Sequence, residues 1–160
     1  MESLNIHIRP FEQNEAIPYE LLLLADPSKK MVDGYINDSL IYLAINENEK
    51  IGVYALLPLN NHVAEIKNIA VHNVHQGKGI GKLLLESAIQ VAKEKGFESL
   101  LIGTANSSVA QLYLYQKCGF EIVEIRKNFF LDNYNEPIFE NGIQCKHMIV
   151  LIKNLNAKDE

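Results

Sequence analysis

The chain has 160 residues, of which 48% are hydrophobic and 22% are charged, and its formal net charge at pH 7 is −5. This balance is typical of a soluble globular domain, and the negative charge argues against a nucleic-acid-binding surface. The longest apolar runs are too short to span a bilayer, and the N-terminus lacks a signal-peptide pattern. We therefore expect one cytoplasmic domain over residues 1–160, with its core at about 4–153, that binds neither nucleic acid nor a membrane.

Hydrophobic periodicity and turn residues divide the chain into short elements. In chain order we predict a strand at 4–8, helices at 18–25 and 26–36, strands at 40–45, 51–57 and 63–71, a helix at 82–95, a strand at 100–102, a helix at 108–117, and strands at 120–125 and 147–152. Asp26 is the expected N-cap of the second helix, with Pro27 in its first turn. The segment 128–144 is expected to be a long polar loop.

The predicted order is a strand, two helices, three strands, a helix, a strand, a helix and two strands. It mixes hairpins with β-α-β crossovers. Such a mixture predicts an α+β fold in which helices pack against one sheet.

A glycine-rich turn lies between the strand at 63–71 and the helix at 82–95, with the sequence Gln76-Gly77-Lys78-Gly79-Ile80-Gly81. Glycines at alternate positions let backbone N–H groups approach an anion at a helix N-terminus, where negative charge is favoured. The spacing does not fit a dinucleotide fingerprint, a P-loop or a kinase glycine loop. It fits Gln-x-x-Gly-x-Gly instead. The plain alternative is a turn that binds no ligand.

A second motif, Leu112-Tyr113-Leu114-Tyr115-Gln116-Lys117-Cys118-Gly119-Phe120, lies further along the chain. With the glycine turn and the element order, it makes residues 4–153 resemble the GNAT superfamily of acyl-CoA-dependent N-acyltransferases. The resemblance implies a mostly antiparallel sheet of about seven strands, with helices on both faces and a parallel fourth and fifth strand that splay apart. The family order is β-α-α-β-β-β-α-β-α-β-β.

The resemblance also implies an activity. The protein would be an N-acetyltransferase that moves an acetyl group from acetyl-CoA to a primary amine, by direct attack through a tetrahedral intermediate. Acetyl-CoA is the implied cosubstrate, and no metal is implied. A homodimer is left open.

The resemblance assigns residues to acetyl-CoA as well. The glycine turn would hold the CoA pyrophosphate on backbone amides, and the strand end before it would pair with the pantetheine arm. The residues concerned are Ile69, Ala70 and Val71 on the strand, and Gln76, Gly77, Lys78, Gly79, Ile80, Gly81 and Lys82 in the turn. The N–H of Ile69 would support the thioester oxygen. Lys78 and Lys82 would add screened charge or simply lie in solvent.

Tyr115 matches the family tyrosine that protonates the departing CoA thiolate. Tyr113, two positions earlier, projects from nearly the opposite face of the helix. The counted distance to Gly119-Phe120 selects Tyr115. The alternative for either tyrosine is a core aromatic residue.

Glu65 is the candidate general base, because an attacking alkylamine is mostly protonated near neutral pH and must lose that proton. Its position matches the glutamate base of the histone acetyltransferase branch. Strict alternation along the strand would place Glu65, Lys67, Ile69 and Val71 on one face. The alternative is a glutamate that faces water beside Lys67. Other branches carry a glutamate on the fifth strand, where this chain has Gly103.

Family members often carry an asparagine that bonds the cofactor where this chain has Ser108. Asn106, two positions earlier, is the candidate for this contact through a longer loop. The alternative is that Asn106 serves only as a helix cap.

The acceptor is less determined: a small amine, an amino acid, or a peptide or protein amine. The family places acceptors between the segments that correspond here to 23–36 and 128–144. Aromatic and acidic residues of the second segment are Phe129, Phe130, Tyr134 and Phe139, with Asp132, Glu136 and Glu140. Such a set suits an amine with an apolar or cationic body. The alternative to an enzyme is a non-catalytic acyl-CoA-binding sensor or interaction module on the same fold.

Overall fold

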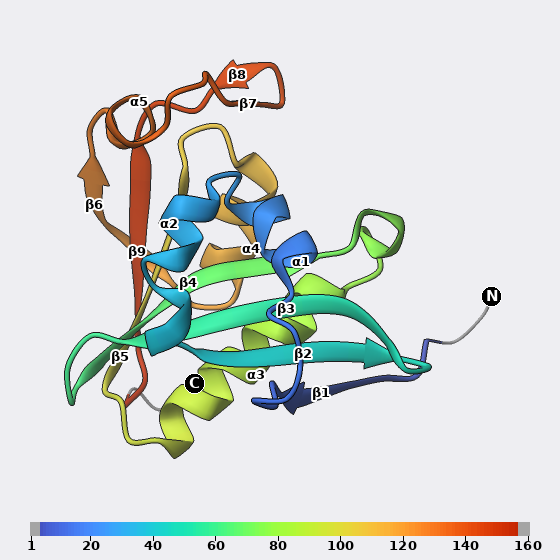
Figure 1. The fold of residues 1–160 in the computed structure, drawn as a ribbon. Helices are drawn as coiled ribbons and strands as arrows, with labels where there is room; N and C mark the ends of the chain where they lie inside the picture. Colours follow the sequence, from blue (N-terminus) through green and yellow to red (C-terminus); the bar gives the residue numbers. More distant parts are fainter. Residues whose placement is uncertain (1–3, 157–160) are drawn as a thin grey trace.

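The computed structural model describes residues 4–156 of the chain, and its elements follow the predicted order, with two 3-10 turns added and with a short helix and a hairpin added in 128–144 (Figure 1). In chain order they are β1 (Ile6–Pro10), α1 (Tyr19–Ala25), α2 (Lys29–Asp33), the 3-10 turn η1 (Ile36–Asp38), β2 (Leu40–Asn46), β3 (Glu49–Pro58), β4 (Val63–Val71), the 3-10 turn η2 (Asn73–His75), α3 (Ile80–Glu94), β5 (Ser99–Ala105), α4 (Val109–Lys117), β6 (Glu121–Arg126), α5 (Phe129–Asn133), β7 (Phe139–Glu140), β8 (Ile143–Gln144) and β9 (Met148–Asn154). None of the helices among these residues has both the length and the apolar character of a membrane-spanning segment.

The sheet has seven strands in the order β1-β2-β3-β4-β5-β9-β6. Its neighbours are antiparallel except for β4 and β5, which are parallel. Apolar side chains pack on both faces. These observations confirm the predicted α+β fold with helices on both sides of a mixed sheet.

Two clusters of buried residues hold the helices to the sheet. The α3-side core joins residues such as Leu84 and Ala88 of α3 to Tyr54 and Leu56 of β3. The α1-side core joins Leu22 and other residues from 21–36 to the opposite face of the same strands. Because β3 contributes to both cores through alternate residues, it is buried almost along its whole length.

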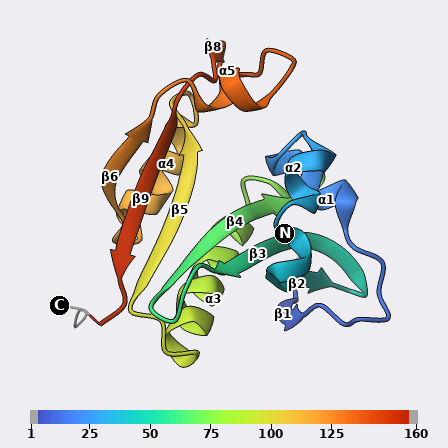
Figure 2. The same ribbon diagram turned by 60° about the vertical axis from the view of Figure 1, so that its left-hand side comes forward.

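The two edges of β4 explain where a cleft can form. β4 pairs with β5 only from Val63 opposite Ser99 to Ile66 opposite Ile102. Beyond that point β4 continues along β3, whereas β5 continues along β9. The two strands therefore diverge, as Figure 2 shows for the green and yellow arrows. The expected splaying of the fourth and fifth strands is confirmed.

A β-bulge interrupts β4 at the same level. Opposite β3, Ile66 faces Leu56 and Asn68 faces Ala55, so Lys67 is an extra residue in β4. An extra residue shifts the alternation of side chains between the two faces of the sheet.

The bulge corrects one prediction about Glu65. Glu65 lies opposite Leu57, which packs on the α1-side core, whereas Ile69 packs on the α3-side core. The prediction that Glu65 shares a face with Ile69 and Val71 is therefore wrong. Strict alternation fails because the bulge adds one residue between them.

The second helix and the predicted polar loop also differ from expectation. α2 is capped by Ser28, whose hydroxyl accepts a hydrogen bond from the N–H of Met31 at 3.2 Å, and not by Asp26. Asp26 instead accepts a bond from the N–H of Ser28. Segment 128–144, predicted as a loop, contains the short helix α5 and the β7–β8 hairpin. Its aromatic residues pack against one another, which orders it: Phe130 stacks on Tyr134 with ring centroids 5.6 Å apart.

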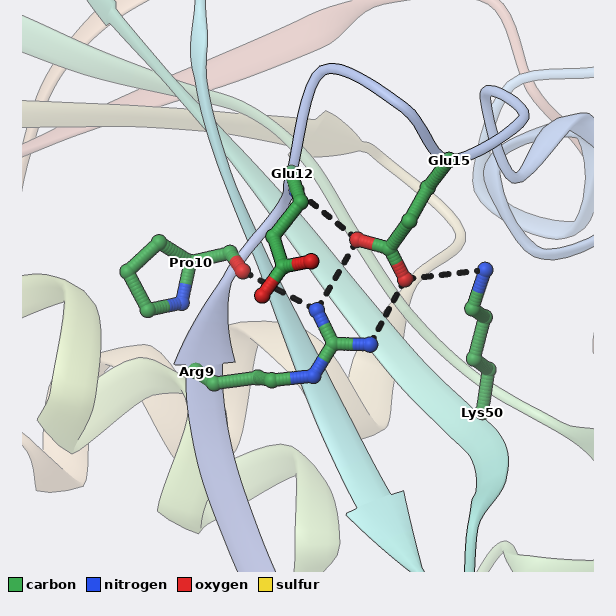
Figure 3. A network of polar contacts seen from close by, with 5 residues as sticks. All are labelled: Arg9, Pro10, Glu12, Glu15 and Lys50. Carbon is green, nitrogen blue, oxygen red and sulfur yellow. Dashed lines mark hydrogen bonds and ion pairs between the residues drawn. The ribbon is translucent and has the colours of Figure 1, made fainter.

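A polar network fixes the segment between β1 and α1 to the hairpin of β2 and β3 (Figure 3). Arg9 donates two hydrogen bonds to Glu15, at 2.6 and 2.9 Å, and Lys50 lies 3.2 Å from the same carboxylate. The N–H of Glu12 also donates to Glu15. The bond from Arg9, with the others, holds the pKa of the Glu15 carboxyl well below its usual range.

Candidate active site

A cleft of about 470 Å³ opens where β4 and β5 diverge. One wall is made by residues 66–71 of β4 and by the end of α1. The other wall is made by residues 102–105 of β5, by α4 and by the segment from α5 to β7. The site is thus assembled from segments far apart in sequence, and the divergence of the two strands creates the room for it.

The glycine turn closes one end of this cleft. Gly77 and Gly79 have φ of +77° and +83°, values that L side chains rarely adopt, and Gly79 is the N-cap of α3. The backbone at Gly81 is ordinary, and a Cβ placed there would meet no atom within 4 Å. Neither the backbone nor the packing therefore requires glycine at position 81. Its small size leaves room above the first turn of a helix, where N–H groups lack intrahelical acceptors.

The turn is tied to the end of β4 by Gln76. Its amide Nε2 donates to the carbonyl of Val71 at 3.1 Å and to Asn73 Oδ1 at 3.2 Å. The neighbouring His75 lines the cleft, and its buried Nδ1 has no hydrogen-bond partner among the described residues. Gln76 therefore holds the glycine turn at a fixed position relative to the strand edge.

Tyr115 lies in the cleft wall and is only 4% exposed. Burial raises the pKa of its phenol, and the charge of the nearby Glu140 carboxylate raises it further. The phenol is consequently protonated at neutral pH. Tyr113, on the opposite side of α4, is 67% exposed and lies outside the cleft.

Nine of the thirteen predicted site residues line the cleft together. They are Tyr115, Ile69, Ala70, Val71, Gln76, Gly77, Gly79, Ile80 and Gly81. The other four, Glu65, Lys78, Lys82 and Asn106, are not among its lining residues. Lys78 is exposed, and Lys82 lies 3.9 Å from Glu86 on the surface of α3.

Glu65 does not line the cleft itself, but it forms an ion pair with Lys67, which does. Its carboxylate lies 3.0 Å from the Nζ of Lys67, and Lys67 is a lining residue. The same Nζ lies 5.5 Å from the centre of the Tyr35 ring. The charge of Lys67 is therefore balanced inside the fold.

Asn106 connects the end of β5 to the segment before β9. Its Oδ1 accepts from the N–H groups of Lys146 and His147, at 2.8 and 3.0 Å, and its Nδ2 donates to the carbonyl of Gln144 at 3.2 Å. Both polar atoms of the amide are thus used within the fold. Ser108 does line the cleft, and its hydroxyl donates to Glu140 Oε2 at 2.6 Å.

Among the polar lining residues that the catalytic and cofactor assignments did not include are Asp26, Asn68 and Glu140, although Asp26 and Glu140 belong to the two segments expected at the acceptor. Asp26 ends α1 and accepts a 2.8 Å hydrogen bond from the hydroxyl of Tyr134. Asn68 is 3% exposed in a strand whose other inward residues are apolar. That single amide among apolar residues was a signal available in the sequence, whereas the approach of Asp26 to Tyr134 was not.

The described residues contain no group of three or more His, Cys, Asp or Glu side chains that could hold a metal ion. The cleft residues offer two kinds of group. The glycine end offers backbone N–H groups to an anion, and the far end offers a protonated phenol and oxygen acceptors.

Comparisons with known proteins agree with this geometry. The family model described as the acetyltransferase (GNAT) family matches residues 4–120. An uncharacterised N-acetyltransferase of Bacillus subtilis is 49% identical over 97% of this chain and 99% of its own length. A crystal structure of a GNAT family acetyltransferase from Elizabethkingia anophelis, with acetyl-CoA bound, is 55% identical and has a TM-score of 0.91, covering 94% of this chain and 98% of its own. A [ribosomal protein bS18]-alanine N-acetyltransferase of Haemophilus influenzae is 40% identical over 60% of this chain and 62% of its own length.

Proposed function

Because this chain belongs to the GNAT family of acetyl-CoA-dependent N-acetyltransferases, we propose that it acetylates a primary amine by direct attack on the thioester. The amine nitrogen forms a bond to the acetyl carbon, the carbon–sulfur bond breaks, and the departing thiolate takes a proton. Acetyl-CoA supplies the activated acetyl group for this reaction. We further propose that the whole chain acts as one catalytic domain, since α1 and α5, from opposite halves of the sequence, both line the cleft.

The glycine turn is proposed to hold the CoA pyrophosphate. The observation that carries this proposal is the open space at Gly81, because no contact within the fold accounts for the missing side chain. Backbone N–H groups at the start of α3, which is 15 residues long, favour an anion there. Lys78 and Lys82, which are outside the lining, would contribute only screened attraction.

The edge of β4 that turns away from β5 is proposed to bind the pantetheine arm. Residues 69–71 line the cleft and lie beyond the last residue of β4 that pairs with β5. An extended ligand can therefore bind along this edge as an added strand would. The N–H of Ile69 is proposed to stabilise the oxyanion that develops on the thioester oxygen.

Tyr115 is proposed to protonate the departing thiolate. Its burial in the cleft wall and its raised pKa keep the phenol protonated until sulfur leaves. A thiol has a pKa of about 8.5 and an ordinary phenol about 10, so complete proton transfer from an ordinary phenol is uphill by roughly 2 kcal/mol, and the raised pKa of Tyr115 adds to this cost. This cost is reduced if the proton is only partly transferred to the sulfur in the transition state.

Glu65 is proposed as the base that takes a proton from the amine. The match to the histone acetyltransferase branch supports this role, and the position of Glu65 next to Lys67, which lines the cleft, is compatible with proton transfer through one water molecule. Asn106 is the remaining residue proposed for a cofactor contact, and both polar atoms of its amide also bond the backbone.

Calorimetric titration with acetyl-CoA, followed by measurement of free thiol release in the presence of amines, tests this function. Binding together with amine-dependent thiol release is the expected result. Binding without release under every amine tried would favour the alternative, a non-catalytic acyl-CoA sensor. No binding at all would contradict the assignment of the glycine turn.

A further inference from the structure

Resting on the proposed function, we propose that the amine acceptor is a small alkyl diamine that carries no carboxylate group. One ammonium group of such a diamine would lie near Tyr115 and be acetylated after deprotonation. The other would remain charged and bind at Asp26. The polar groups at the far end of the cleft carry this inference.

Asn68 supplies the first observation. Its Nδ2 donates to the carbonyl of Leu22 at 2.9 Å and to the hydroxyl of Tyr35 at 3.0 Å. A carbonyl can only accept, so the amide is held with its nitrogen toward Leu22. Its Oδ1 is buried, has no hydrogen-bond partner among the described residues, and belongs to a residue that lines the cleft. A buried oxygen without a partner is costly, and a ligand N–H group would satisfy it.

Two carboxylates supply the second observation. Asp26 lies on the α1 wall and Glu140 on the opposite wall, and both line the cleft. Asp26 Oδ1 accepts bonds from the Tyr134 hydroxyl and the Ser28 N–H, and Glu140 Oε2 accepts one from Ser108. Over residues 4–156, neither carboxylate has a lysine, arginine or histidine partner within 4.0 Å.

The charges in this part of the cleft are therefore unbalanced. Lys67 lines the cleft, but its ammonium lies 3.0 Å from Glu65, so that pair has no net charge. Two negative charges remain, one on each wall. A ligand with two positive charges would balance them, whereas a ligand with a carboxylate would add a third negative charge.

The aromatic pair of α5 supplies the third observation. Phe130 and Tyr134 stack with their rings 28° apart, and both line the cleft. Tyr134 holds Asp26 through its hydroxyl, so the aromatic faces and the carboxylate occur together. An ammonium group with its alkyl chain suits this combination, because the aromatic faces attract the cation and cover the chain.

The test compares three acceptors of equal chain length by thiol release from acetyl-CoA. They are 1,5-diaminopentane, lysine, which is the same diamine with a carboxylate, and pentylamine, which lacks the second amine. We expect kcat/KM for the diamine to exceed that for each of the other two by about tenfold or more, a difference of about 1.4 kcal/mol.

The Asp26→Asn variant tests the position of the second charge. Asparagine can still accept the bonds from Tyr134 and Ser28, so the fold of the turn is kept. We expect the advantage of the diamine over pentylamine to fall below about twofold. Asp132→Asn is the matched control, because it removes the same charge from exposed α5 outside the cleft lining and should leave the advantage intact.

Equal use of lysine and the diamine, or of pentylamine and the diamine, would overturn this inference and leave the acetyltransferase function intact. Calorimetric binding of 1,5-diaminopentane to the protein saturated with CoA is a second measurement that needs no turnover. Binding that Asp26→Asn abolishes, without thiol release, would support the diamine site and contradict the proposed catalysis. Absence of both binding and turnover would overturn the inference.

Discussion

The hydroxyl of Tyr134 donates a 2.8 Å hydrogen bond to Asp26 Oδ1, and the two residues are 108 positions apart. Asp26 ends α1, on the wall that contains β4, and Tyr134 follows α5, on the opposite wall that contains β5 and α4. This bond therefore joins the two walls at the point where the sheet no longer does. Burial raises the pKa of the Tyr134 phenol, and the charge of Asp26 raises it further, so the hydroxyl remains a donor at neutral pH.

Replacement of Tyr134 by phenylalanine removes this bond and leaves the ring in place. We expect the free energy of unfolding to fall by about 1.5 kcal/mol, the usual value for a hydrogen bond to a charged group, and KM for the acceptor to rise. Urea unfolding and steady-state kinetics measure the two effects. Tyr19→Phe is the control, because it removes a tyrosine–carboxylate bond to Asp33 on the surface. An unchanged acceptor KM in Tyr134→Phe would show that the bond does not shape the acceptor end.

The Gly81→Ala variant should affect protein stability and acetyl-CoA affinity in opposite directions. The added methyl group meets nothing within 4 Å, and alanine favours helix, so we expect stability to rise by about 0.5 kcal/mol. The same methyl group occupies the space proposed for the pyrophosphate, so the Kd for acetyl-CoA should rise about tenfold.

Gly79→Ala is the contrasting variant for this position. The φ of +83° at Gly79 strains any other residue, so this variant should lose stability as well as affinity. Calorimetric titration gives both Kd values. If Gly81→Ala bound acetyl-CoA as tightly as the parent protein, the pyrophosphate would have to bind elsewhere.

Glu65→Gln tests the proposed base. We expect kcat to fall about a hundredfold. The loss should be greatest at low pH, where the largest fraction of the amine is protonated and needs a base. The Kd for acetyl-CoA should stay the same. Glu98→Gln provides the control, since it removes an equal charge from an exposed glutamate beside His62. A pH–rate profile identical to that of the parent protein would exclude Glu65 and leave water or a backbone group as the base.

The network around Glu15 gives a pH-dependent contribution to stability (Figure 3). The pKa of this carboxyl is lower in the folded protein than the value of about 4.3 for an unfolded chain. Such a group stabilises the fold above the unfolded pKa, and this contribution is lost as the pH falls toward the folded pKa. Glu15→Gln should therefore lower Tm at pH 7, and the difference from the parent protein should shrink below about pH 4. The control is Glu12→Gln, and a difference that stayed constant with pH would contradict the pKa assignment.

The sheet and most helices could be predicted because their apolar residues follow the periods of strands and helices. Three features could not. The bulge at Lys67 depends on the pairing of β4 with β3, which no local pattern records. The helix and hairpin within 128–144 are too short for periodicity and are ordered by stacked aromatic rings and by bonds such as that of Ser108 to Glu140. The N-cap of α2 is Ser28 and not the predicted Asp26. Both side chains can cap a helix, so the sequence alone does not distinguish them.

The residues of the cleft also divide into those that could be predicted from the sequence and those that could not. Its glycine end and Tyr115 follow from motifs with fixed spacing, and the structure brings these residues together. The acceptor end does not follow from spacing, because Asp26, Asn68 and Glu140 come from three separate elements. Asn106 was expected near the cofactor, yet its amide bonds the backbone at 144–147. Residues from separate elements are brought together only by the tertiary fold.

The most direct test of the account is the Tyr115→Phe variant, measured for both acetyl-CoA affinity and amine-dependent turnover. We expect Kd to change by less than about twofold, while kcat falls about a hundredfold or more, because the phenol acts on the departing thiolate and not on binding. The exposed Tyr113→Phe serves as control and should behave like the parent protein. Turnover of Tyr115→Phe at the parent rate would contradict the proposed mechanism.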